Sequence, residues 1–358
     1  MSDLMAYERL ISTRIMQYDV ESIYSLMTTE RDDTFAMEII PYFALFVQAC
    51  QEYMGGNFLP ENIAKDIKDI RNYIKKYADG FGKSQKRIKN IDAIQDKNFR
   101  DQLRFGILKK AGIYLNLGTY WIDDGIIIGN TQQLADFLSV ADLNAPEVAG
   151  KHYEMGYQIG AFVNSVREGF AEVSEPPVII RNKTSLEVNY YCDFNTNRKN
   201  KLFAENLPKE FNLFFLHLLC NMNFVKHILR PLFKDGNLWS FRVEYIVAYY
   251  TLRALERLKN HFKSNNEIIE TKSLDPILLE ANNLFKTKLR NCMMHYNLEN
   301  AEVISLTNID KPFWGIIENC FEGMEYQSYL LRLHQFSDMV IGYLEKQFNF
   351  SEVKLKVL

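Results

Sequence analysis

Apolar side chains recur at helical spacing along most of this chain, and that periodicity constrains its fold more than any other feature. The stripe is clearest in residues 4–29, 61–80, 238–263 and 324–348. Apolar residues at positions i, i+3, i+4 and i+7 lie on one face of an α-helix. Helices of this kind bury their stripes against one another. The sequence therefore predicts a mainly all-α protein.

One short region departs from that pattern. Residues 178–181 and 187–192 are rich in β-branched and aromatic side chains, and they flank the polar residues 182–184. Two such runs around a polar turn predict a β-hairpin. We interpret it as packing filler, with a dimer arm or a substrate lid as the functional alternatives.

The sequence Glu175-Pro-Pro177 precedes this hairpin and marks the point where the helical pattern stops. We predict three segments: a helical N-terminal domain of unknown role at 1–175, a β-hairpin and linker at 176–204, and a helical bundle at 205–358. The last segment shows four long amphipathic helices, which favour an up-down four-helix bundle.

Composition excludes several classes of function. Apolar residues make up 47% of the 358 residues, charged residues make up 24%, and the net charge is −3. A protein that coats nucleic acid without specificity needs a basic balance, although a local basic cleft stays compatible with RNA binding. No stretch approaches the roughly 18 apolar residues of a membrane span. The N-terminus lacks the pattern of a signal peptide. We expect a cytoplasmic protein with no membrane association.

Metal and cofactor sites are not indicated. Five cysteines are dispersed along the chain without a Cys-x-x-Cys pair, at Cys50, Cys192, Cys220, Cys292 and Cys320. They are typical of reduced thiols rather than of a zinc site. Asp123 and Asp124 are adjacent, and adjacent side chains point apart, so a role in a turn or cap is favoured over metal binding. We expect neither a metal nor a cofactor.

The chemistry of the chain is concentrated in residues 285–296, which read Phe-Lys-Thr-Lys-Leu-Arg-Asn-Cys-Met-Met-His-Tyr. Only here do four to six residues separate an Arg from a following His. The guanidinium of Arg290 keeps its charge and fits a phosphate. The imidazole of His295 takes and gives a proton near neutral pH. Together they suffice for attack of an RNA 2′-hydroxyl on its own phosphate.

Helix geometry makes one copy of this pair a poor site. Residues five apart lie about 140° apart around an ideal helix, so Arg290 and His295 are expected on different faces, whereas Asn291 and His295 share one. A two-fold dimer presents each residue twice in one cleft. A charge-favourable end of a helix, with no catalytic role, is the alternative interpretation of the same residues.

The residue pattern Arg-Asn…His-Tyr resembles the signature motif of the HEPN superfamily, and the resemblance covers roughly the last 150 residues. The resemblance implies a helical bundle with its signature on the third helix, acting as a homodimer. It also implies a metal-independent endoribonuclease that leaves a 2′,3′-cyclic phosphate, in a toxin system or in antiviral host defence, with an antitoxin or defence partner. His295 is then the acid/base, Arg290 binds the phosphate and Asn291 orients the pair. The alternative is a non-catalytic HEPN module that binds a nucleotide or a partner protein.

Neighbouring residues are further candidates. Lys286 and Lys288 are expected to guide the RNA backbone, and Tyr296 to hydrogen-bond in the cleft, although packing under the helix end suits Tyr296 equally. Arg242 and Glu244 stand where the family often holds a polar residue that orients the Arg. An exposed pair on a helix is the interpretation favoured for these two.

Overall fold

The computed structural model describes most of the chain. The described residues are 2–28, 33–56, 58–101, 106–107, 117–122, 125–137, 146–170, 186–191, 202–203, 207–233, 237–263, 271–296, 298 and 310–349.

The fold is mainly all-α, as predicted. The longer helices are α1 (Ser2–Thr28), α2 (Asp33–Met54), α3 (Glu61–Lys76), α4 (Phe81–Asp101), α7 (Pro146–Glu168), α8 (Lys209–Asn223), α10 (Leu238–Lys263), α11 (Asp275–Leu284) and α14 (Tyr326–Glu345). The shorter elements are α6 (Thr131–Phe137), the π-helix η1 (Phe224–Leu229), α9 (Arg230–Leu232), η2 (Lys272–Leu274), α12 (Thr287–Met294), η5 (Pro312–Gly315) and α13 (Ile316–Cys320). Among the described helices, none combines the length and apolar character needed to span a bilayer.

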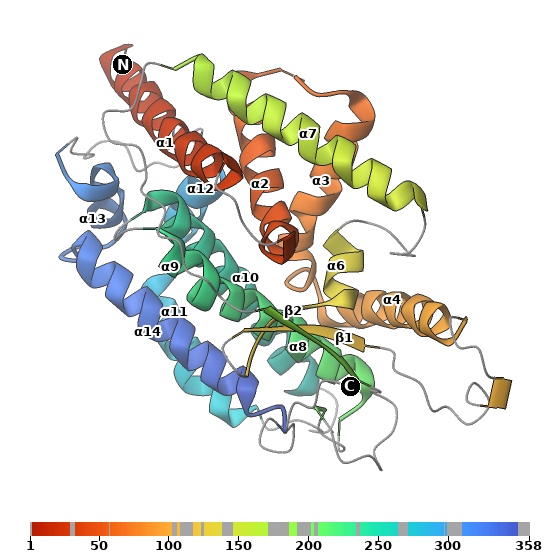
Figure 1. Ribbon diagram of the computed structural model, residues 1–358. Helices are drawn as coiled ribbons and strands as arrows, with labels where there is room; N and C mark the ends of the chain where they lie inside the picture. Colours follow the sequence, from red (N-terminus) through yellow and green to blue (C-terminus); the bar gives the residue numbers. More distant parts are fainter. Residues whose placement is uncertain are drawn as a thin grey trace.

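Helix α10 occupies the middle of the molecule. Figure 1 shows α1, α2, α3 and α7 on one side of it and α11 and α14 on the other. Buried side chains on both sides belong to one hydrophobic cluster that includes Ile15 of α1, Leu255 of α10 and Val340 of α14. The predicted boundaries at residues 175 and 204 stay predictions, and helices from both sides of them share this core.

The predicted third helix of the last segment is two helices. Phe285 and Lys286 have extended backbone between α11 and α12, with φ −111° and −116°. The break places the Phe285 ring against three others, because its centroid lies 5.2 Å from Tyr245, 5.8 Å from Tyr249 and 5.1 Å from Phe336. Burial of an aromatic ring therefore outweighs helix continuity at this point.

The β-structure is a three-stranded antiparallel sheet of order β2-β1-β3, formed by β1 (Leu117–Ile122), β2 (Ile126–Asn130) and β3 (Leu186–Tyr191). The strand predicted at 187–192 is thus present as β3, paired with β1, while residues 178–184 and Asp123-Asp124 lie outside the described residues. The sequence also predicts a helix over residues 98–118, and its end is wrong, because Leu117 and Gly118 belong to β1. The local pattern misled because β1 and β2 are almost wholly buried, so apolar and polar residues do not alternate along them.

The sheet is fastened to α8 by buried amides. Asn223 Nδ2 donates to Ile127 O at 3.0 Å, and Asn130 Nδ2 approaches Cys220 Sγ at 3.6 Å. The Glu38 carboxylate of α2 lies against the position that a Cβ of Gly129 would occupy, so a larger residue there would displace the Glu38 side chain. Burial raises the pKa of Glu38 well above its ordinary value. Helices α2 and α8 therefore both contact β2.

The core also contains a neutral histidine. His217 of α8 is fully buried, and its Nδ1 lies 2.5 Å from Tyr77 Oη of the segment that follows α3. Burial lowers the pKa of His217 to about 3. The imidazole is therefore uncharged in the folded protein over the physiological pH range.

This histidine predicts a specific pH dependence of stability. The folded protein resists protonation of His217, whereas the unfolded chain protonates it near pH 6.5, so stability present above pH 6.5 is lost as the pH falls toward 3. Between pH 7 and pH 5 the wild type should lose about 2 kcal/mol more unfolding free energy than His217→Gln. Urea unfolding at a series of pH values measures the difference, and parallel curves for the two proteins would contradict it.

Candidate functional site

The Arg–His stretch ends α12. Arg290 lies inside the helix, while His295 is its C-cap, with extended backbone at φ −134° and ψ 155°. His295 N donates to Asn291 O at 3.1 Å, which closes the last turn. The 140° separation expected for a continuous helix does not apply, because the chain leaves the helix at His295. Both side chains are partly buried, and the charge of Arg290 acts on the imidazole of His295.

The guanidinium of Arg290 is held on one side and unpartnered on the other. Its Nη1 donates to Asn291 Oδ1 at 2.9 Å, and its Nη2 donates to Tyr250 Oη of α10 at 3.4 Å. Its Nε is buried without a hydrogen-bond partner. Asn291 is thus a hydrogen-bond partner of Arg290, and its role in orienting the Arg–His pair stays a prediction. A buried N–H donor with no partner carries a free-energy cost.

His295 faces the N-terminal part of the chain. Its Nδ1 lies 3.2 Å from Glu52 Oε2 of α2, and the two side chains remain 37% and 42% exposed. Burial lowers the pKa of His295, the Glu52 carboxylate opposes that effect, and the charges of Arg71 and Arg290 add to it. The net shift is downward. The imidazole is therefore neutral near pH 7, and a carboxylate at Nδ1 favours the tautomer that leaves the Nε2 lone pair available.

We define Glu52, Arg71, Arg290 and His295 as the motif cluster. Arg71 of α3, like Arg290, has a buried Nε without a hydrogen-bond partner. Sequence reasoning missed both Glu52 and Arg71. Glu52 lies 243 positions from His295, and neither residue stands in a motif, so no local signal identifies them. Only the packing of α2 and α3 against the end of α12 brings them there.

The three predicted substrate-binding residues have different surroundings. Lys286 Nζ donates to Cys320 O at 2.8 Å and lies 4.5 Å from the centroid of the Phe321 ring. Lys288 is exposed. Tyr296 is 1% exposed, and its hydroxyl donates to Asp19 Oδ2 at 2.5 Å. Lys286 and Lys288 are thus both exposed, whereas Tyr296 packs beneath the helix end.

The exposed pair expected at Arg242 and Glu244 is wrong, because both are buried, at 4% and 1% exposure. Arg242 forms an ion pair with Asp19 of α1 and donates from Nη2 to Met293 O at 2.8 Å and from Nη1 to Tyr296 Oη at 3.3 Å. A buried guanidinium therefore caps the last turn of α12 and holds the residue next to His295. Glu244 contacts none of the motif cluster.

Comparison with known proteins gives no relative. No protein-family model matches the chain, and neither a curated protein nor a solved structure matches it. Within the described part of the chain, no group of three or more His, Cys, Asp or Glu side chains is placed to hold a metal ion.

Replacing Arg242 by Met is expected to destabilise the fold strongly. The change leaves the Asp19 carboxylate buried and unpaired, which costs about 3–5 kcal/mol. Arg253→Met on the same helix is the matched control, since Arg253 pairs with Glu256 while 45% exposed, and it should cost no more than about 1 kcal/mol. Urea unfolding distinguishes the two. Equal losses in both variants would show that the buried pair does not anchor α12.

Proposed function

We propose that this protein is a metal-independent endoribonuclease of HEPN type. It cleaves RNA by attack of a 2′-hydroxyl at a cleft between two copies of the chain, in the cytoplasm, as part of host defence or a toxin system. The observation that carries the proposal is the motif cluster, in which Arg290 and the neutral His295 meet at a partly exposed helix end. The HEPN resemblance of residues 285–296 supports the same reaction.

The electrostatics of the cluster suit a phosphodiester. Arg71 and Arg290 each have a buried Nε–H without a hydrogen-bond partner, and the charge of each lowers the pKa of His295. Phosphate oxygens are the acceptors that guanidinium donors prefer. Glu52 is the one carboxylate of the motif cluster, and it pairs with His295 rather than with either arginine. A scissile phosphate bound here brings its negative charge to two arginines.

The reaction then follows from the protonation states. The lone pair of His295 Nε2 takes the proton of the 2′-hydroxyl as the new O2′–P bond forms. Arg290 stabilises the charge that develops on the non-bridging oxygens. The P–O5′ bond breaks, and the leaving oxygen takes from His295 the proton that the imidazole accepted from the 2′-hydroxyl. The products are a 2′,3′-cyclic phosphate and a 5′-hydroxyl, with no metal in the scheme.

A non-catalytic module is the second proposal, and one observation favours it. His295 Nδ1 already has Glu52 of its own chain as partner, which is also how a structural histidine at a helix end is satisfied. In that case the motif cluster forms a pocket for a nucleotide or a partner protein. Wild-type protein would then cleave no RNA, and the variants below would change binding alone.

The nuclease proposal predicts that Arg290→Ala and His295→Ala each lower the rate of RNA cleavage in EDTA by at least about a hundredfold, because each removes one half of the reaction. The measurement is single-turnover cleavage of a labelled RNA with detection of the cyclic phosphate. His227→Ala, a partly buried histidine on the π-helix, is the control and should cleave as the wild type does.

The dimer is tested by mixing the two inactive variants. Co-expressed Arg290→Ala and His295→Ala chains form mixed dimers with one intact arginine and one intact histidine in the shared cleft. Cleavage should return in part if the cleft lies between copies. If the mixed dimers stay inactive while each wild-type copy is active, the site operates within one chain, and the two-fold arrangement is wrong.

Glu52 gives the cleavage reaction a predicted pH signature. The acid limb of the rate profile should have its midpoint below about pH 6.5, because burial holds the pKa of His295 below its ordinary value. Glu52→Gln removes the carboxylate that opposes this shift, so the pKa falls further and the limb moves to lower pH. Glu61→Gln, an exposed carboxylate in the first turn of α3, is the control. A limb that stays in place or moves to higher pH excludes Glu52 from the site.

A further inference from the structure

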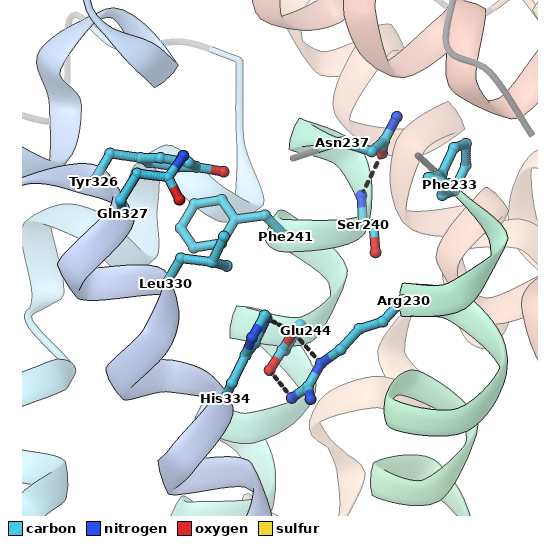
Figure 2. A pocket seen from close by; sticks show the side chains of 10 residues that line it. All are labelled: Arg230, Phe233, Asn237, Ser240, Phe241, Glu244, Tyr326, Gln327, Leu330 and His334. Atoms are coloured by element: carbon cyan, nitrogen blue, oxygen red, sulfur yellow. Dashed lines mark hydrogen bonds and ion pairs between the residues drawn. The ribbon is translucent and has the colours of Figure 1, made fainter. Parts of the chain in front are cut away.

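A cavity lies away from the motif cluster. It encloses about 430 Å³ between the end of α9, the first turns of α10 and the first half of α14 (Figure 2). Small-molecule sites span about 300–1,000 Å³. The cavity uses Ser240, Phe241 and Glu244 of α10, whereas the motif cluster is contacted by Tyr250 further along that helix. The two share no lining residue.

An Arg–Glu–His triad, formed by Arg230, Glu244 and His334, lies at one end of this cavity (Figure 2). Arg230 binds the carboxylate in a bidentate manner, with Nε donating to Glu244 Oε2 at 2.8 Å and Nη2 donating to Oε1. His334 Nε2 lies 3.2 Å from Oε2, and Ser337 Oγ donates to Oε1 at 3.0 Å. Burial acts to raise the pKa of Glu244, but the hydrogen bonds from His334 and Arg230 outweigh it. The carboxylate is therefore ionised and fully engaged.

The triad presents its nitrogen-bearing side chains, rather than its carboxylate, to the cavity. The Glu244 side chain is 2% exposed, whereas Arg230 is 18% and His334 is 33% exposed. Glu244 uses two nitrogens of Arg230, and Nη1 is not among them. No other carboxylate among the described residues lines the cavity. An anionic group of a ligand is thus attracted to this end.

The register of Arg230 has a local cause. It follows directly after the six-residue π-helix Phe224–Leu229, which interrupts the helix that begins at α8. A π-helical turn inserts a residue and rotates everything after it, and such turns are frequent at functional sites. Here the rotation brings Arg230 to Glu244 across the cavity.

The other end of the cavity is aromatic and holds an unpartnered hydroxyl. Tyr326 is 3% exposed, its Oη has no hydrogen-bond partner, and Figure 2 shows its side chain directed toward the cavity. Its ring centroid lies 5.2 Å from that of Phe241, and Leu330 adds a second apolar wall. Buried hydroxyls are nearly always paired, so this one indicates a missing acceptor.

We propose that this cavity binds a small organic anion with a planar ring, of the class of nucleoside monophosphates. The phosphate meets Arg230 and His334, the base lies against Phe241 and Leu330, and Tyr326 Oη donates to a polar atom of the ligand. Neither end alone selects this class, because inorganic phosphate leaves the apolar wall uncovered and an uncharged ring leaves the guanidinium unmatched. The proposal does not depend on the nuclease.

Calorimetric titration of the full chain with adenosine 5′-monophosphate tests it. The wild type should bind with a dissociation constant below about 1 mM, and adenosine and inorganic phosphate, titrated separately, should each bind at least about tenfold more weakly. Tyr326→Phe removes one oxygen and should weaken binding of the monophosphate by about tenfold, the loss of a single hydrogen bond.

A matched pair of tryptophan variants locates the ligand. Leu330→Trp fills the cavity and should abolish binding, whereas Leu331→Trp, on the adjacent exposed position, should leave it unchanged. Binding should also persist in His295→Ala. The proposal is overturned if the wild type binds no monophosphate, if Leu330→Trp binds as Leu331→Trp does, or if only His295→Ala abolishes binding, which would move the ligand to the motif cluster. If inorganic phosphate binds as tightly as the monophosphate, the planar ring contributes nothing to binding, and the proposed ligand class is wrong.

Discussion

The buried ion pair between Asp19 and Arg242 is the interaction on which the arrangement of this molecule depends most. It joins α1 to α10, and the same guanidinium donates to Met293 O and Tyr296 Oη at the end of α12. Removing two charges from water is costly, and hydrogen bonds to the buried pair offset part of that cost. Here the acceptors come from two separate stretches of chain, residue 19 and residues 293–296, so the positions of α1, α10 and α12 are set together. His295 lies in sequence between Met293 and Tyr296, so the hydrogen bonds of Arg242 to these two residues also fix the position of His295.

Helix α10 distributes its polar residues between two sites that do not overlap. Arg242 and Tyr250 face the end of α12, while Glu244, two residues from Arg242, faces α9 and α14. Residues two apart on a helix point in nearly opposite directions. The helix therefore supports the motif cluster with one face and the Arg–Glu–His triad with another. Both sites lie on an element whose register is held by buried charge.

How much the sequence predicts differs from element to element for physical reasons. The bounds of α10 follow from its apolar stripe, because such a stripe needs no knowledge of the partner. The break at Phe285 does not, since it exists to bury a ring against α10 and α14. Arg242 and Glu244 have no local mark of burial, because a charge is buried only when a distant partner accepts it. Arg290, Asn291 and His295 were found together because their spacing is local, while Glu52 and Arg71 come from helices more than 200 residues away in sequence.

That last difference bears on what the N-terminal helices do. The proton chemistry proposed for His295 requires a neutral imidazole with its Nδ1 side occupied, and Glu52 of α2 supplies the acceptor. Arg71 of α3 adds the second guanidinium, and its charge helps to keep the pKa of His295 low. Without α2 and α3, His295 would be better solvated and its pKa would return toward the ordinary value. The signature residues therefore belong to a site that the C-terminal helices do not complete alone, and any movement of α2 relative to α12 changes the protonation of the proposed base.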